Sequence, residues 1–273
     1  MEYKNGDLYK GSFSKGFIDG EGVFTEERGK YVGGFKDDKY HGIGTYTWKN
    51  CDSYEGMWVD GKRCNQGKHT IISEGVYEGA FKNGKYEGVG CFTYLSGDFY
   101  NGEWSKGRKL GRGKFTFING NVYEGDFVDN AFRGNGVYTY TNGDVARCEY
   151  VDNKKNGFGI CNYASGAVYE GDWKDDLKHG NGTMKYKNND VYTGSFVSDV
   201  KEGSGVYKYA VGHTYDGEYI NDRKNGYGVF SYKLGMITLI HHNTYAHCLV
   251  FIVQEICSKD FIGTIRGTEW ELM

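Results

Sequence analysis

The stretch that decides the fold is YEGDF (Tyr123–Phe127), then the six residues VDNAFR (Val128–Arg133), then GNGVYTY (Gly134–Tyr140). Alternate residues of a β-strand share one face, so Tyr123 and Phe127 lie on the same side as Gly125. The second half alternates in the same way, with a glycine followed by two tyrosines on one face. A glycine leaves room for a neighbouring ring, and the ring covers the backbone that the glycine leaves bare. Both halves therefore predict β-strands.

The segments between the two strands predict how they are joined. Val128–Arg133 is polar enough to form a six-residue hairpin loop. Asn142-Gly143, after Tyr140, is a strong signal for a tight turn in which both central residues take positive φ. One unit is therefore expected to run strand, loop, strand, tight turn.

This unit recurs ten times, with a spacing of 22 residues once and 23 residues thereafter. Such a period is typical of repeat architectures, and we number the units as repeats 1 to 10. Their first positions are Tyr9, Tyr31, Tyr54, Tyr77, Tyr100, Tyr123, Ala146, Tyr169, Tyr192 and Tyr215. A later Gly-x-Gly pair recurs in every repeat except the third, where Asn65 replaces the first glycine.

The composition excludes several classes of protein. Among 273 residues there are 44 Gly, 25 Tyr and no Pro, which argues against both disorder and collagen and favours a folded all-β repeat. A net charge of −3 indicates neither a nucleic-acid partner nor an acidic one. Seven cysteines without a Cys-x-x-Cys pair indicate a reducing compartment. With no signal peptide and no apolar run of membrane-spanning length, we expect a cytoplasmic protein.

Tyr-x-Gly-x-aromatic followed by Gly-x-Gly-x-aromatic resembles the MORN repeat (membrane occupation and recognition nexus), over roughly residues 3–232. The resemblance implies an elongated, single-layer, twisted antiparallel sheet of about ten stacked β-hairpins. Two strands per repeat at about 4.8 Å give a length of about 95 Å. We expect a repeat array over residues 1–232 and a capping or partner-binding tail over residues 233–273.

Three irregularities interrupt the pattern. Tyr3–Asp7 matches the end of a preceding repeat, so the chain starts with a half-repeat and an open edge. Repeat 7 has Ala146 and Cys148 where other repeats have Tyr and Gly, which predicts a weak joint or a bend. The tail loses the glycine rhythm, and Phe261–Ile265 imitates a repeat opening only weakly. The tail is interpreted as a cap, or alternatively as a partner-binding or dimerising element or as decayed repeats.

The aromatic face is the first candidate binding surface. A groove lined by rings suits an extended or helical peptide with apolar anchors; the alternative is that these rings pack only on each other as a core. The candidates for the partner groove are Tyr54, Trp58, Tyr77, Phe81, Tyr100, Trp104, Tyr123 and Phe127.

The predicted six-residue loops are the second candidate. They hold 18 Lys or Arg and 12 Asp or Glu, a net charge of +6 expected along one edge of the sheet. Such an edge can attach weakly to anionic phospholipid, although solubility alone also explains it. The candidates for the lipid edge are Lys62, Arg63, Lys82, Lys85, Lys106, Arg108, Lys109, Lys154, Lys155, Arg223 and Lys224.

No motif for catalysis stands out. Gly56–Arg63 nearly spells a phosphate loop but lacks the Ser or Thr and the following helix. His241, His242, His247 and Cys248 do not have zinc-site spacing. We therefore predict no catalytic residue, no metal and no cofactor.

The expected function is a non-catalytic scaffold or adaptor that binds a protein partner and possesses weak affinity for anionic phospholipid. The resemblance implies cytoskeletal or peripheral membrane sites, and self-association as a homodimer through the terminal strand or the tail is a further hypothesis. The alternative is a regulatory MORN module of a lipid kinase or methyltransferase whose catalytic part lies elsewhere.

Overall fold

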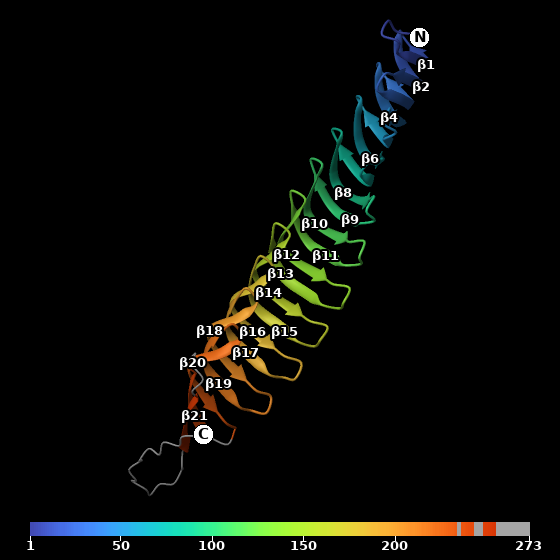
Figure 1. The fold of residues 1–273 in the computed structure, drawn as a ribbon. Coiled ribbons are helices and arrows are strands. Elements are labelled where there is room, and N and C mark those ends of the chain that lie inside the picture. Colours follow the sequence, from blue (N-terminus) through green and yellow to red (C-terminus); the bar gives the residue numbers. More distant parts are fainter. Residues whose placement is uncertain (234–235, 243–247, 255–273) are drawn as a thin grey trace.

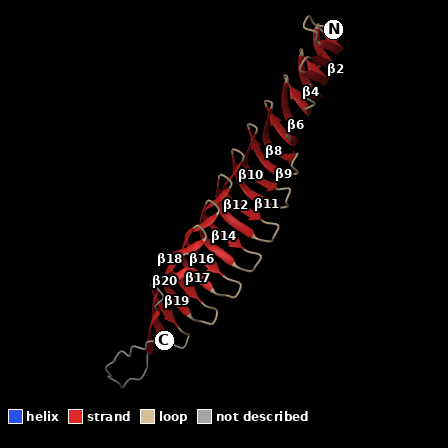
Figure 2. Cartoon of the chain, viewed as in Figure 1, coloured by secondary structure: helices blue, strands red, loops and turns tan. Residues whose placement is uncertain are grey.

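The protein is a single antiparallel β-sheet of 22 strands, in which each strand pairs with its neighbours in the chain. A computed structural model describes residues 1–233, 236–242 and 248–254, with side chains described as far as Lys233. The described residues contain strands and turns and no helix (Figure 2). The sheet is a long twisted rod with β1 near one end and β20 near the other (Figure 1). The predicted fold class is confirmed.

Each repeat consists of one odd-numbered strand, which carries Tyr-x-Gly-x-aromatic, and one even-numbered strand, which carries Gly-x-Gly. The strands are β1 (Leu8–Ser14), β2 (Phe17–Glu26), β3 (Gly29–Lys36), β4 (Lys39–Trp48), β5 (Ser53–Val59), β6 (Lys62–Ile71), β7 (Gly75–Lys82), β8 (Lys85–Tyr94), β9 (Phe99–Ser105), β10 (Arg108–Thr116), β11 (Val122–Val128), β12 (Ala131–Thr139), β13 (Val145–Val151), β14 (Lys154–Asn162), β15 (Val168–Lys174), β16 (Leu177–Lys185), β17 (Val191–Val197), β18 (Val200–Lys208), β19 (Thr214–Ile220), β20 (Arg223–Ser231), β21 (Met236–His242) and β22 (Cys248–Gln254).

The connection within a repeat is a two-residue turn, so the prediction of a six-residue loop over Val128–Arg133 is wrong. Val128 pairs with Ala131, and only Asp129 and Asn130 lie between them, with φ of 49° and 73°. Two central residues with positive φ are typical of a type I′ hairpin turn. The strands therefore continue almost to the edge of the sheet.

The connection between repeats is wider than predicted. The amide of Tyr140 donates to the carbonyl of Asp144 at 2.9 Å and that of Gly143 to the carbonyl of Tyr140 at 3.0 Å. Gly143 has a φ of 93°, whereas Asn142 is not among the residues with positive φ. These features are typical of a three-residue loop in which one glycine takes the left-handed conformation, so the prediction that both residues of Asn-Gly take positive φ is wrong.

The first glycine of each Gly-x-Gly pair forms a bulge. Gly134 has a φ of 72°, and the pairing of β11 with β12 shifts register between Gly125 and Phe127. The bulge places Phe132 on the same face as Tyr123, against which its ring stacks at 3.7 Å. Asn65 takes this position in repeat 3 with a φ of 50°, because asparagine tolerates the left-handed region better than most residues.

The core is a row of tyrosines that lie flat over glycines. Nine of the ten repeat-opening residues are tyrosines with no exposed surface. In repeat 6, a β-carbon added to Gly136 would lie 2.5 Å from the ring of Tyr123, and the Tyr123 hydroxyl donates to the carbonyl of Asp126 at 3.0 Å. The same ring meets Tyr150 of repeat 7, with centroids 5.1 Å apart. Each repeat thus completes the core of its neighbour, as expected of a linear repeat protein.

Along both sides of the rod, where the turns lie, side-chain oxygens accept hydrogen bonds from the backbone of the neighbouring repeat. At the edge with two-residue turns, the amide of Phe132 donates to Asn153 Oδ1 at 2.8 Å. At the opposite edge, the amide of Ala164 donates to Asp144 Oδ1 at 2.7 Å. Because these acceptors belong to a neighbouring hairpin, they fix the spacing of the repeats as well as the shape of each turn.

Repeat 7 keeps its strand pairing despite its altered sequence. β13 pairs with β12 and with β14, and Ala146, Cys148 and Cys161 are all buried. The sulfur of Cys148 lies against Gly159, where other repeats have the tyrosine ring, and burial raises the pKa of its thiol to about 12. The predicted weak joint is thus not visible as a break in the sheet, although the buried hydroxyl of Tyr150 has no hydrogen-bond partner.

The two ends differ from the repeats between them. The first residues partly cover the edge predicted to be open, because the Met1 ammonium donates to the carbonyl of Tyr9 at 2.7 Å. Phe13 is still 50% exposed, whereas the equivalent Phe127 is 1% exposed. At the other end, the backbone of the tail adds β21 and β22 to β20. The predictions for Phe261–Ile265, for His247 and for the side chains of His241, His242 and Cys248 fall outside the described residues.

Candidate binding face

The eight residues predicted to line a partner groove form the core of the sheet. None of them is more than 6% exposed, and they contact one another edge to face, as Tyr100 and Trp104 do at 5.2 Å. These rings therefore pack on each other as a core, which was the alternative to a groove, and in this structure a partner could not reach them. The eight residues are Tyr54, Trp58, Tyr77, Phe81, Tyr100, Trp104, Tyr123 and Phe127.

A second row of rings on the same face is partly open. These residues lie two or four positions after the second glycine of a Gly-x-Gly pair, and we call the partly open ones the ring row. Tyr46 and Phe92 have equivalent positions but are buried. Most are half-buried, and Tyr232 is 39% exposed. The ring row consists of Phe24, Trp48, Tyr94, Phe115, Phe117, Tyr138, Tyr140, Tyr163, Tyr186, Tyr207, Tyr209, Phe230 and Tyr232. The spacing was visible in the sequence, but both rows contain tyrosine, so the sequence alone did not tell which one is open.

Contacts within the ring row cross from one repeat to the next. Phe117 of repeat 5 lies 5.8 Å from Tyr138 of repeat 6, and Tyr209 of repeat 9 lies 5.7 Å from Phe230 of repeat 10. The row therefore presents apolar ring surface along much of the rod, with hydroxyl groups at intervals. Such rings carry a large share of binding energy in protein interfaces.

A row of cations runs beside the ring row in the last four repeats. Lys155, Lys178, Lys201 and Lys224 occupy the position that Phe132 has in repeat 6, and we call them the lysine row. Their ammonium groups lie over rings, at 4.0 Å from the centroid of Trp173 for Lys155 and 4.4 Å from that of Tyr215 for Lys224. Each ammonium lies over aromatic rings, and the side chains are largely covered. Lys155 is 8% exposed, and the side chains of Lys178 and Lys201 are 18% and 15% exposed.

Lys109 of repeat 5 occupies the same position and is the most deeply buried lysine described. It is 7% exposed, and its ammonium lies 4.6 Å from the ring centroid of Phe115. Desolvation by burial lowers the pKa of Lys109 to about 8.

The residues predicted for a lipid edge divide into two groups. Arg63, Lys109, Lys155 and Lys224 turn inward over rings. The others remain exposed, but two of them are paired with the turn of the next repeat, Arg108 with Asp129 at 3.0 Å and Lys154 with Asp175 at 3.4 Å. The exposed residues are Lys62, Lys82, Lys85, Lys106, Arg108, Lys154 and Arg223.

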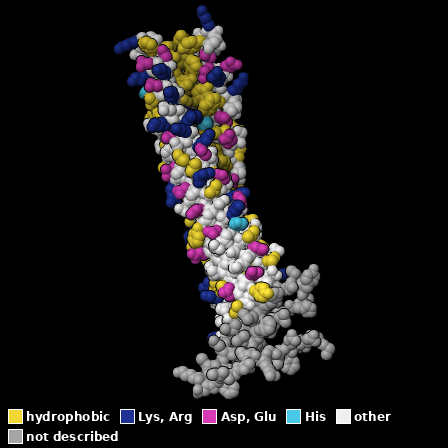
Figure 3. Space-filling model, turned by 90° about the vertical axis from the view of Figure 1, so that its left-hand side faces the viewer, with side chains coloured by type: hydrophobic (Ala, Val, Ile, Leu, Met, Phe, Trp, Pro, Cys, Tyr) yellow, Lys and Arg dark blue, Asp and Glu magenta, His cyan; other side chains and the backbone are white. Residues whose placement is uncertain are grey.

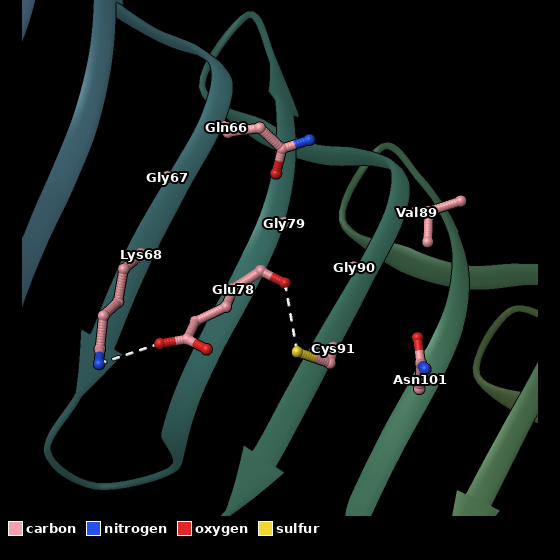
Figure 4. Close-up of a pocket in the computed structure, with 9 residues that line it drawn as sticks. All are labelled: Gln66, Gly67, Lys68, Glu78, Gly79, Val89, Gly90, Cys91 and Asn101. Atoms are coloured by element: carbon pink, nitrogen blue, oxygen red, sulfur yellow. Dashed lines mark hydrogen bonds and ion pairs between the residues drawn. The ribbon is translucent and has the colours of Figure 1, made fainter.

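The opposite face of the sheet carries shallow hollows over the glycines. One of about 550 Å³ lies over Gly67, Gly79 and Gly90 (Figure 4). Its rim holds the ion pair of Lys68 with Glu78 at 2.9 Å. Both partners are about half exposed, so the pair is weak.

One apolar hollow lies near the N-terminal end of the rod. It has a volume of about 370 Å³ and is lined by Tyr3, Phe24, Phe35 and Tyr40 among others. On the face drawn in Figure 3, hydrophobic side chains gather toward the same end, whereas the lower described part of that face shows mostly backbone and side chains that are neither hydrophobic nor charged. The described residues hold no group of three or more His, Cys, Asp or Glu side chains placed to bind a metal ion. They also include no helix that could cross a bilayer.

The fold and the aromatic face define a class of protein, an open β-sheet built from hairpin repeats. The chain belongs to the MORN repeat family, whose model matches residues 9–25, 31–50, 54–73, 77–99, 100–122, 123–145, 149–168, 169–191, 192–214 and 215–233. The seventh match begins at Glu149, after the altered residues of repeat 7. No curated protein matches the chain significantly.

Several solved structures are distantly similar in fold. The TCP10 domain of Danio rerio CPAP in complex with a peptide of STIL is 11% identical, with a TM-score of 0.49, over 78% of this chain and 94% of that chain. The TCP domain of Drosophila melanogaster SAS-4 in complex with a proline-rich motif of Ana2 is 13% identical, with a TM-score of 0.37, over 65% of this chain and 90% of that chain.

Proposed function

We propose that this MORN repeat protein is a non-catalytic scaffold whose ring row binds a polypeptide segment of a protein partner. The observation that carries the proposal is the ring row itself, because it leaves aromatic surface partly open across successive repeats. A chain lying along the rod meets the same surface every two strands, or about 9.6 Å. The rings are held by the sheet, so little conformational entropy is lost when they bind.

The ring row can be tested by peptide selection. The full chain is used to select binders from a display library of random 16-residue peptides, and the dissociation constants are measured by fluorescence anisotropy. Replacing Tyr140 and Tyr163 together by Ser is expected to weaken binding at least tenfold, because apolar anchors at interfaces contribute more than about 1.4 kcal/mol.

The control variant is Phe158→Ser, which removes a 51% exposed ring from the opposite face. It is expected to leave the peptide affinity unchanged, and circular dichroism melts check that both variants are folded. The proposal is wrong if the selected peptides bind the Tyr140→Ser/Tyr163→Ser variant as tightly as the original chain.

Attachment to anionic phospholipid is a second proposal. It concerns the side of the sheet with the two-residue turns, and only those cations on it that form no ion pair with a neighbouring turn. Lys62, Lys85 and Lys106 of repeats 3 to 5 are exposed and form no ion pair in the described part of the chain. Each contributes at most about 1 kcal/mol near an anionic surface. We expect the protein to sediment with anionic liposomes at low salt and less at 300 mM salt. Sedimentation that does not change with salt contradicts this second proposal.

Three hypotheses from the sequence stay as predictions, because no observation on the described residues tests them. They are a regulatory role beside a lipid kinase or methyltransferase, a location at cytoskeletal or peripheral membrane sites, and a homodimer formed through the terminal strand or the tail. The exposed Phe13 on β1 is consistent with the last of these, and analytical ultracentrifugation at high concentration tests it.

A further inference from the structure

The residue type at the position of the lysine row changes along the rod, from mixed in the first six repeats to lysine in the last four. In repeats 1 to 6 it holds, in order, Ile18, Tyr40, Arg63, Tyr86, Lys109 and Phe132. In repeats 7 to 10 it holds a lysine every time. Phe132 and Tyr86 fill the same place with an apolar ring, so packing against the core tyrosine does not require a cation. Four consecutive lysines therefore need a reason other than the stability of the core.

The cations of the lysine row are incompletely paired. The ammonium of Lys178 lies 3.8 Å from Asp199 Oδ1, and that of Lys201 lies 3.8 Å from Asp222 Oδ1. Both distances exceed the range of a hydrogen bond, and both carboxylate oxygens already accept a backbone amide at 3.0 Å.

The outer members of the row have still fewer anionic neighbours. Within the described part of the chain, no carboxylate lies within 4.0 Å of the ammonium of Lys155 or Lys224. Lys224 donates to the hydroxyl of Tyr209 at 2.7 Å. An ammonium group has three donors, so the partly exposed Lys178, Lys201 and Lys224 retain capacity to bind anionic groups, whereas Lys155 is buried.

The distance between neighbouring lysines limits the conformation of an anionic polypeptide that could contact all of them. Neighbouring lysines are one repeat apart, which is two strands or about 9.6 Å. A chain in the extended polyproline II conformation has three residues per turn and rises about 3.1 Å per residue, so every third side chain returns to the same face after about 9.3 Å. An α-helix needs seven residues to return to the same face, over about 10.5 Å, and would drift from the lysines by about 1 Å at each repeat. An extended chain therefore stays in register better.

We propose that repeats 7 to 10 bind an acidic, extended segment of the protein partner, with carboxylates at every third residue on the lysine row and the intervening residues on Tyr163, Tyr186 and Tyr209. This inference rests on the proposed function, because it names the chemistry of the segment that the ring row takes.

A labelled 13-residue peptide with Glu at positions 2, 5, 8 and 11 and Ser or Gly elsewhere is the probe. We expect it to bind the full chain at 50 mM salt and to lose at least tenfold in affinity at 300 mM salt, because its contacts are ionic. A peptide with Gln in place of Glu is expected not to bind. Moving the same four Glu to adjacent positions is expected to weaken binding at least fivefold.

The decisive variant is Lys178→Met/Lys201→Met, because methionine keeps an unbranched side chain over the rings and removes only the charge. It is expected to weaken binding of the Glu peptide at least tenfold. The matched control is Lys174→Met/Lys208→Met, which removes two exposed lysines from the same two repeats. The control is expected to bind within twofold of the original chain.

The results separate this inference from the proposed function. If the Lys178→Met/Lys201→Met variant binds the Glu peptide as well as the control does, the inference is overturned. Peptides selected by the ring row that prove uncharged also overturn it, while the proposed function stands. If the Glu peptide does not bind the original chain, and the Lys178→Met/Lys201→Met variant no longer sediments with anionic liposomes, the lysine row binds lipid and the inference fails.

Discussion

Replacing Trp104 by Ala is expected to lower the free energy of unfolding by about 3–5 kcal/mol, the usual cost of deleting a buried aromatic side chain. Trp104 is 6% exposed, and its indole N–H donates to the carbonyl of Gly90, in the preceding repeat, at 3.0 Å. The rings of Tyr77 and Tyr86 in that repeat each lie 5.3 Å away. The loss should therefore be shared by repeats 4 and 5.

Urea denaturation measures the size of this effect, and amide hydrogen exchange by repeat shows where it falls. The control is Trp48→Ala, since Trp48 is only half-buried, and we expect it to cost less than half as much. Faster exchange confined to repeat 5 would contradict the idea that each repeat completes the core of its neighbour. Equal losses for the two tryptophans would contradict the assignment of the core row.

The row of rings over glycines could be predicted because two periods agree in the sequence. The period of two within a strand places Tyr123 and Gly125 on one face, and the period of 23 repeats that face along the chain. Burial of these tyrosines follows from stacking, since no single hairpin can cover its own ring. For this reason the fold could be predicted from the sequence, although the amino-acid composition is unusual.

The turns could not be predicted, because the residues that determine them look like loop residues. Asp129-Asn130 is polar and lies beside an apolar ring, Phe132, which the sequence does not mark as part of a strand. The bulge at Gly134 then moves Phe132 to the tyrosine face. A register shift of this kind has no separate signal in a single sequence, since glycine in a strand has several explanations.

The same error concealed the lysine row. When the residues between the two strands are taken as a loop, Lys155 and Lys224 count as edge cations with the exposed Lys154 and Arg223. With the strands continued to a two-residue turn, successive residues alternate between faces, and one lysine of each pair turns inward. The recurrence of Lys155, Lys178, Lys201 and Lys224 at intervals of 23 was the available signal.

Gly136→Ala is expected to lower the free energy of unfolding by about 2–3 kcal/mol, in the range of overpacked cores. At a position with ordinary φ, replacing Gly by Ala normally stabilises a protein by about 0.4–1 kcal/mol, and Gly136 is not among the positive-φ glycines. Here the added carbon would lie 2.5 Å from two atoms of the Tyr123 side chain. Contact with the ring, and not backbone strain, should therefore reverse the usual sign.

The comparison variant is Gly107→Ala, at a turn glycine with a φ of 86° and no atom within 4 Å of the added carbon. It should cost about 1–2 kcal/mol through backbone strain alone. In a Tyr123→Leu background, Gly136→Ala should cost at least about 1 kcal/mol less than in the original chain, because the ring is gone and the two sites couple directly. Repeat 7 shows a related coupling in its sequence. It opens with Ala146 in place of tyrosine and has Cys148 at the position of Gly125, where an added β-carbon would lie 2.5 Å from the Tyr123 hydroxyl. Equal costs of Gly136→Ala in both backgrounds would mean that the ring does not occupy the space the glycine leaves.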